Sequence, residues 1–99
     1  MFARTSTWTG SAEALGRWAE QAQSSVRPFV AALEGNAGAF FFVDRAAGRA
    51  LTLTLWRTEE AALASDEAAE RSRAHTVAAT GVELLERSRY EVVTGTEPA

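Results

Sequence analysis

The stretch that decides the fold is residues 40–56, which read FFFVDRAAGRALTLTLW. Two runs of β-forming residues flank the turn-like sequence DRAAGR, and this arrangement predicts a β-hairpin. In the second run the leucines at 51, 53 and 55 fall on one face, whereas Thr52, Thr54 and Trp56 fall on the other. The first run, residues 40–43, is apolar on both faces. We therefore expect both faces of the hairpin to be covered.

A strand and a helix are predicted before the hairpin. Residues 2–8 are rich in threonine and aromatic residues, which favours a strand. Apolar residues then recur at spacings of three and four between residues 15 and 33, which predicts a helix with one apolar stripe. Ser11 is the expected N-cap of this helix. Because Pro28 removes one helical hydrogen bond and clashes with the preceding turn, we expect a kink or a break near Arg27.

A second helical region and a last strand are predicted after the hairpin. Thr58 followed by two glutamates is typical of a helix N-terminus, because the hydroxyl caps the helix and the acids lie at its positive end. We expect this region to run to about Thr80, where Gly81 closes it. Residues 84–93 predict a strand, and the tail 94–99 is expected to be frayed.

The predicted order of elements is strand, helix, strand, strand, helix, strand. Two βαβ-like halves with right-handed crossovers give an α+β, ferredoxin-like βαββαβ fold with a four-stranded antiparallel sheet and both helices on one face. No linker or repeat divides the chain, so residues 1–99 are expected to form a single domain.

The second face of this sheet is the basis for a predicted assembly. With the helices on one face, the FFFV run and Trp56 would lie on the other, where several large side chains are each worth about 1.5–3 kcal/mol if buried. The simplest cover is a second copy of the same sheet packed face to face. The sequence therefore predicts a homodimer, which for this fold is a dimeric α+β barrel.

Composition excludes several classes of function. The chain has no cysteine, which excludes disulfides and thiolate metal sites. Its net charge is −3 and its basic residues are scattered among the acidic ones, so we expect no nucleic-acid partner. No apolar run is long enough for a membrane span, and the N-terminus lacks the apolar core of a signal peptide. We expect a soluble cytoplasmic protein without a membrane partner.

The sequence resembles a known family over nearly its whole length. The stretches that carry the resemblance are MFAR at the start, FVDR at 42–45, GRAL at 48–51, TLW at 54–56, the helix start EEA and RYEV at 89–92. Together they resemble the antibiotic-biosynthesis-monooxygenase-like members of the dimeric α+β barrel proteins. The resemblance implies the same fold as the strand order does. Known members include cofactor-independent oxygenases of polyketide phenols and heme-degrading enzymes.

The resemblance implies a pocket between the helices and the sheet. In the oxygenases a tryptophan that ends the third strand borders this pocket, and Trp56 matches it. Thr52 and Thr54 share its strand face and are candidate polar walls, although a moderately polar barrel interior would also explain them. Thr7 on the first strand and Leu63 on the second helix are further candidate substrate-binding residues. Trp56 itself can be either a pocket wall or a core plug.

His75 is the second candidate catalytic residue, because it is the only side chain that titrates near neutral pH by default. The alternative is a solvated histidine on a polar helix. Heme-degrading relatives place a proximal histidine near this position. They also use an asparagine on the first strand, where this chain has Thr5 and Thr7, and a second tryptophan on the helix, where it has Ser65. We therefore do not expect heme degradation.

The charged residues of the second helix do not predict a metal site. Arg71 and Arg73 could hold an anionic substrate, but they are also placed to pair with Glu67 and Glu70 at helical spacings, so we expect surface ion pairs. There is no second histidine, and no carboxylates converge on His75 by sequence. We expect neither a metal nor another cofactor.

Two functions of different class remain open. The first is a cofactor-independent monooxygenase, in which an aromatic substrate is held against Trp56, loses a phenolic proton and reacts with oxygen as its own carbanion. The second is a non-catalytic dimer whose pocket binds a small apolar ligand or is filled. The presence of Trp56 favours the first. The oxygenases also use a tyrosine on the helix, and its replacement by AAL at 61–63 favours the second.

Overall fold

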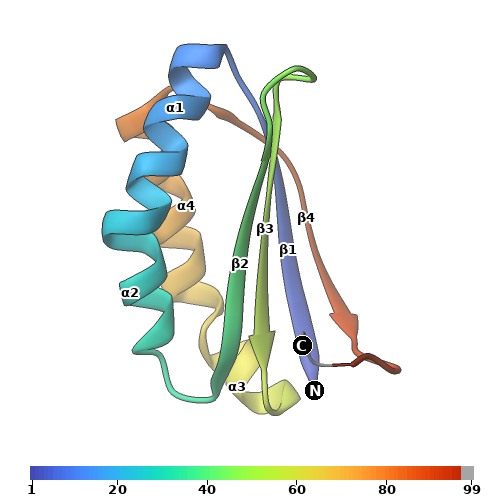
Figure 1. The fold of residues 1–99 in the computed structure, drawn as a ribbon. Helices are drawn as coiled ribbons and strands as arrows, with labels where there is room; N and C mark the ends of the chain where they lie inside the picture. Colours follow the sequence, from blue (N-terminus) through green and yellow to red (C-terminus); the bar gives the residue numbers. More distant parts are fainter. Residues whose placement is uncertain (97–99) are drawn as a thin grey trace.

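The computed structural model describes residues 1–96 and confirms the predicted ferredoxin-like βαββαβ fold. The elements in chain order are β1 (Phe2–Thr9), α1 (Ala12–Gln21), η1 (Ala22–Val26), α2 (Arg27–Ala31), β2 (Asn36–Asp44), β3 (Arg49–Trp56), α3 (Glu59–Ala64), α4 (Asp66–Thr80) and β4 (Glu83–Glu91). The sheet has the order β2-β3-β1-β4, and every neighbouring pair is antiparallel. The helices lie on one face of it (Figure 1). We call this the helix face and the opposite one the open face.

The first helical region contains the irregularity that Pro28 predicts. Ser11 caps α1 by accepting a hydrogen bond from the backbone N–H of Ala14. Before Pro28 the chain forms the π-helical turn η1, and the N–H of Arg27 donates to the carbonyl of Ala22 five residues back. A π turn widens the helix where the proline ring would clash with the preceding turn. The predicted break near Arg27 is therefore a local change of helical register.

The second helical region is divided where we expected one continuous helix. Thr58 caps α3 by accepting from the N–H of Ala61, as predicted, and Gly81 ends α4 with a left-handed φ of +83°. At Ser65, however, the region breaks into α3 and α4. The Ser65 hydroxyl donates to the carbonyl of Ala62, and Arg4 of β1 donates to the same carbonyl. These side chains supply the hydrogen bonds that a continuous helix would have made.

The strand boundaries differ slightly from those expected. β1 extends to Thr9, and β4 runs from Glu83 to Glu91 with a change of register opposite Thr7 and Trp8. Residues 94–96 belong to no helix or strand, and the rest of the predicted frayed tail lies outside the described residues. Within residues 1–96, no helix combines the length and the apolar character needed to cross a membrane.

Trp56 lies on the helix face, so the prediction that it lies on the uncovered face is wrong. Trp56 is only 1% exposed and packs with Val30 of α2 and Ala62 of α3. Strand alternation then turns the leucines at 51, 53 and 55 towards the open face, together with Phe40 and Phe42 of β2. The hairpin has two apolar faces, as predicted, but the leucine face is the one that the helices leave uncovered.

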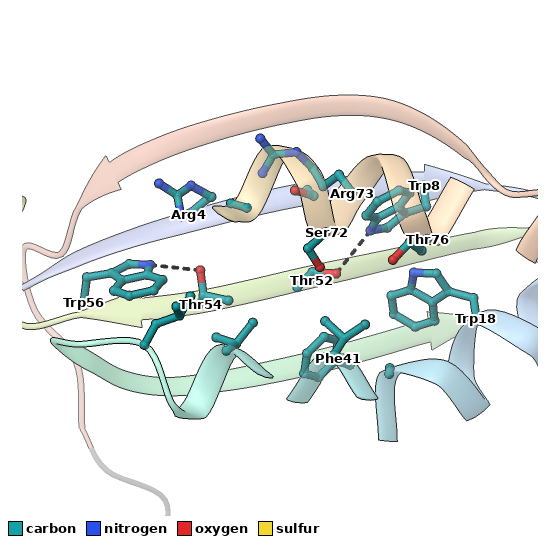
Figure 2. Close-up of a pocket in the computed structure, with 16 residues that line it drawn as sticks. Arg4, Trp8, Trp18, Phe41, Thr52, Thr54, Trp56, Ser72, Arg73 and Thr76 are labelled. Carbon is teal, nitrogen blue, oxygen red and sulfur yellow. Dashed lines mark hydrogen bonds between the residues drawn. The ribbon is translucent and has the colours of Figure 1, made fainter. Parts of the chain in front are cut away.

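The core consists of two clusters at opposite ends of the helix face. One cluster is built around Leu15, Trp8 and Trp18, and the other around Trp56 and Val30. Figure 2 shows Trp56 of one cluster and Trp8 and Trp18 of the other on either side of the middle of the helix face, where α4 presents the short side chains of Ser72 and Thr76. The fold thus leaves space between helices and sheet.

Candidate functional site

A cavity of about 60 Å³ lies between the helices and the helix face of the sheet. Figure 2 shows Trp56 at one end of it and Trp8 and Trp18 at the other, with Phe41 of β2 along one side. The polar side chains of the wall are short hydroxyls from both layers, namely Ser6, Thr52, Thr54, Ser72 and Thr76, together with two arginines. Aromatic walls with a few hydroxyl groups are typical of a site for a small, mainly apolar molecule.

The two threonines of β3 are held by the indole groups of the cavity. The Nε1 of Trp56 donates to the Oγ1 of Thr54 at 3.0 Å, and the Nε1 of Trp8 donates to the Oγ1 of Thr52 at 3.1 Å. Both hydrogen bonds appear as dashed lines in Figure 2. A hydroxyl that accepts from an indole still carries its own proton. Thr52 and Thr54 can therefore donate to an acceptor atom in the cavity.

Arg4 lies beside Trp56, and its donors are used by the protein itself. Its guanidinium donates to the Oγ of Ser65 at 2.8 Å and to the carbonyl of Ala62 at 2.7 Å, and it forms an ion pair with Asp66. The guanidinium carbon is 5.6 Å from the centroid of the Trp56 ring, within range of a cation–π interaction. Burial lowers the pKa of Arg4, which the Asp66 carboxylate opposes. Arg4 thus holds the junction of α3 and α4 against β1.

Arg73 differs from Arg4 because one of its buried donors has no partner among the described residues. Its side chain is only 11% exposed, and one terminal nitrogen donates to Glu70 at 2.7 Å. Its buried Nε makes no hydrogen bond to any residue of the range 1–96. An unpaired buried donor costs about 1–3 kcal/mol, so an acceptor atom that reached it would be bound favourably. Arg73 lines both the cavity and the groove between α4 and β4.

An ion-pair network closes the side of the cavity between α4 and β4. Arg87 donates to both carboxylate oxygens of Glu70, at 2.6 and 2.7 Å, and Arg89 donates to Asp66 at 3.3 Å. The hydrogen bonds from Arg73, and then from Arg87, lower the pKa of Glu70. Asp66 therefore links Arg4 of the cavity wall to Arg89 of β4. Glu70 links Arg73 to Arg87 in the same way.

This network predicts a specific loss of stability in acid. The pKa of Glu70 is lower in the folded state than its ordinary value of 4.5. The contribution of Glu70 to the free energy of unfolding is therefore fully present above pH 4.5 and is lost as the pH falls through the folded pKa. In Glu70→Gln this part of the pH dependence should be missing. Thermal unfolding between neutral pH and about pH 3 tests it, since free carboxylates titrate in that range. Glu67→Gln, which removes only the exposed pair with Arg71, is the matched control. Equal acid sensitivity of wild type and Glu70→Gln would contradict the prediction.

The structure brings together only part of the candidate residues from the sequence. Thr52, Thr54 and Trp56 line the cavity. Thr7 lies on the open face, and Leu63 is exposed on α3. His75 is exposed on the outer side of α4, in a groove that also contains Phe29. A functional role for these three stays a prediction from the sequence. Among residues 1–96, no three His, Cys, Asp or Glu side chains are grouped to hold a metal ion.

Sequence reasoning did not consider Arg4, and it favoured a surface ion pair for Arg73. The predicted pairs of Arg71 with Glu67 and of Arg73 with Glu70 both exist, at 3.4 and 2.7 Å, but the Arg73 side chain is only partly exposed, unlike that of Arg71. For Arg4 a signal was present, because it alternates on β1 with Trp8 and so shares the inward face. For Arg73 the helix pattern carried no such signal, since few apolar residues mark the inward face of α4.

Comparison with known proteins identifies the fold. No family model matches the sequence, and no curated protein matches it. Among solved structures, a candidate antibiotic biosynthesis monooxygenase from Deinococcus radiodurans matches with a TM-score of 0.74 and 16% identity, covering 100% of this chain and 99% of that one.

Two further solved structures have the same fold. The ActVA-Orf6 monooxygenase of Streptomyces coelicolor, in complex with Nanaomycin D, matches with a TM-score of 0.72 and 13% identity over 99% of this chain and 92% of that one. A point mutant of SnoaB, a cofactor-independent oxygenase from Streptomyces nogalater, gives a TM-score of 0.60 and 17% identity over 95% and 94%. The chain therefore matches antibiotic biosynthesis monooxygenase structures over its full length at low sequence identity, which confirms the fold that the resemblance implied.

Proposed function

We propose that the cavity binds a small aromatic molecule and that the protein is a cofactor-independent monooxygenase of a phenol. The observation that carries the proposal is the cavity itself, whose wall combines aromatic rings with the hydroxyls of Thr52 and Thr54 and includes Arg73. The shared fold supports it, because SnoaB is a cofactor-independent oxygenase and ActVA-Orf6 is a monooxygenase bound to Nanaomycin D.

In this proposal the residues of the cavity stabilise a phenolate. The ring of the substrate lies against Trp56, and its phenolic oxygen lies near Arg73, whose charge favours ionisation. The phenolate carries electron density on a ring carbon, which reacts with dioxygen to form a carbon–oxygen bond. Loss of water from the hydroperoxide gives a quinone. Since Arg4 and Arg73 are the only ionisable residues of the range 1–96 in the cavity wall, the phenolic proton passes to water.

The size of the cavity limits how a substrate can bind. An engineered cavity of about 150 Å³ in another protein accommodates benzene. The cavity here, at about 60 Å³, is smaller. A ring can therefore enter only when side chains of the wall move. This smallness also favours the second candidate function, a dimer that holds a small apolar ligand or none and performs no chemistry.

Oxidation of a dihydroxynaphthalene tests the proposal, because one dioxygen is consumed for each quinone and water formed. We expect the wild-type protein to take up oxygen in step with quinone absorbance. Arg73→Met should lower kcat by about 100-fold, the usual effect of removing a group that stabilises developing charge. Arg71→Met, an exposed arginine on the same helix, is the control. Saturable binding without oxygen uptake would favour the non-catalytic function, and no binding at all would contradict both ligand-dependent functions.

The proposed functional unit is a homodimer built on the open face. Phe40 and Phe42 are 45% and 49% exposed there, and their rings stack with centroids 6.3 Å apart. The leucines at 51, 53 and 55 continue this apolar surface on β3. A second copy of the same sheet would cover it by two-fold symmetry. The cytoplasmic location expected from the composition completes the proposal.

A further inference from the structure

Three grooves on the surface share residues with the cavity wall. They differ in the side chains that separate each groove from the cavity. Between α4 and β4 the shared residues are Arg4 and Arg73, which ion pairs hold in place. Beside His75 the shared residues are Val26 and Ser72. The third groove has a volume of about 290 Å³ and lies between the α1–η1 segment and the edge strand β2. We call it the edge groove.

Two aromatic rings separate the edge groove from the cavity. Trp18 of α1 and Phe41 of β2 line both spaces, as does the small Ala22 of η1, and the two rings meet edge to face with centroids 6.2 Å apart. Figure 2 shows the two side chains reaching towards each other from helix and strand. Phe41 is only half-buried, and neither ring is held by a hydrogen bond to a described residue. This wall can therefore open by rotation of a side chain, whereas the wall at Arg4 and Arg73 opens only if ion pairs break.

The rim of the edge groove is positively charged. Arg27, directly after the π turn, and Arg45, directly after β2, both line it. Within residues 1–96, no acidic residue lines the groove and neither arginine takes part in an ion pair. In the groove between α4 and β4, by contrast, Asp66 and Glu70 are bound to arginines. The edge groove thus combines an aromatic wall with positive charge that no carboxylate of the described chain offsets.

We infer that the edge groove is the entrance to the cavity and that it selects aromatic ligands that carry a carboxylate. The ring passes Trp18 and Phe41 into the cavity, while the carboxylate stays at the rim with Arg27 and Arg45. Guanidinium groups bind carboxylates through charge-assisted hydrogen bonds. The inference rests on the proposed function of the cavity, and it narrows the substrate class to hydroxylated aromatic acids.

A matched pair of ligands tests the selection by charge. Naphthoate and naphthalenemethanol share a ring system, and only the first is an anion. Energy transfer from the tryptophans of the cavity reports binding of either. At about 0.01 M salt, where the Debye length is about 30 Å, we expect naphthoate to bind about 10-fold more tightly. The double variant Arg27→Gln/Arg45→Gln should abolish this preference and change the affinity for the alcohol by less than about 2-fold.

The control variant is Arg57→Gln/Arg71→Gln, which removes the same charge from exposed arginines outside the edge groove. It should keep the preference for the acid. A preference that survives the loss of Arg27 and Arg45, or that disappears equally in the control, would overturn the inference and leave the proposed function standing. Saturable energy transfer with neither ligand would overturn both.

Association rates test the route. Phe41→Ala, or Phe41→Leu if the alanine variant is unstable, should speed the association of both ligands several-fold. Phe29→Ala, in the groove beside His75, should leave both rates unchanged. The opposite pattern would place the entrance between Val26 and Ser72 and would overturn the inference.

Discussion

Trp56→Ala is expected to lower the free energy of unfolding by about 3–5 kcal/mol, the usual cost of truncating a buried aromatic residue to alanine. The ring is almost completely enclosed and packs between Val30 and Ala62. The substitution also removes the hydrogen bond to Thr54 and the contact with Arg4. A loss of this size is a large part of the total stability of a small domain.

Urea unfolding followed by circular dichroism measures this loss. Trp56→Phe is the informative partner, because it keeps a ring and gives up mainly the indole N–H, worth about 0.5–1.5 kcal/mol. If Trp56 is a pocket wall, Trp56→Phe should weaken binding of an aromatic ligand more than it lowers stability. A loss below about 1 kcal/mol in Trp56→Ala would contradict the packing role that we assign to the ring.

The second large effect is expected on the open face. Leu53 lies in the middle of β3 between Phe40 of β2 and Thr5 of β1, and it is half-buried in the isolated subunit. If a second copy covers this face, Leu53→Glu places a carboxylate from each subunit in an apolar interface. Burying an unpaired charge is costly enough to shift the protein from dimer to monomer at micromolar concentration.

Light scattering of wild type and variant measures this shift. Leu63→Glu is the matched control, because the same substitution then falls on an exposed leucine of α3 away from the open face. It should leave the oligomeric state unchanged. A wild-type protein that is a folded monomer at micromolar concentration would contradict the dimer itself.

The sequence was sufficient for the architecture because the main signals are local. The turn after residue 43, the caps Ser11 and Thr58 and the terminator Gly81 all act within a few residues of themselves, and the structure contains each of them. The break at Ser65 could not be predicted in this way. It depends on Arg4, which is 61 positions away in the chain.

The site was predictable only in part, because it too depends on contacts between segments that are distant in the chain. Strand alternation placed Thr52, Thr54 and Trp56 on one face, but it does not say which face the helices cover. The choice depends on whether the tryptophan or the leucines fit better beneath the helices. Arg73 was assigned to a surface ion pair because a charged residue on a polar helix normally faces solvent. Only the packing of α4 against the sheet shows that its Nε is buried.

The π turn before Pro28 has a consequence for the phase of the helix. Trp18, Ala22, Val26 and Val30 all line the cavity and are spaced by four residues each. At about 100° per residue, the interval from 18 to 30 would turn an α-helix roughly 120° beyond three full turns, so Val30 would face away from Trp18. The one extra residue that a π turn accommodates removes about 100° of this excess.

The π turn therefore determines which side chains of α2 line the cavity. An unbroken α-helix of unchanged length would rotate α2 about its axis and turn Val30 away from Trp56, with which it packs in the core cluster. A chain shortened by one residue within η1 would instead keep Val30 in phase with Trp18, because the extra residue and the π turn that accommodates it would be lost together. Comparable helices without the insertion would therefore present the same side chains of α2 to the sheet.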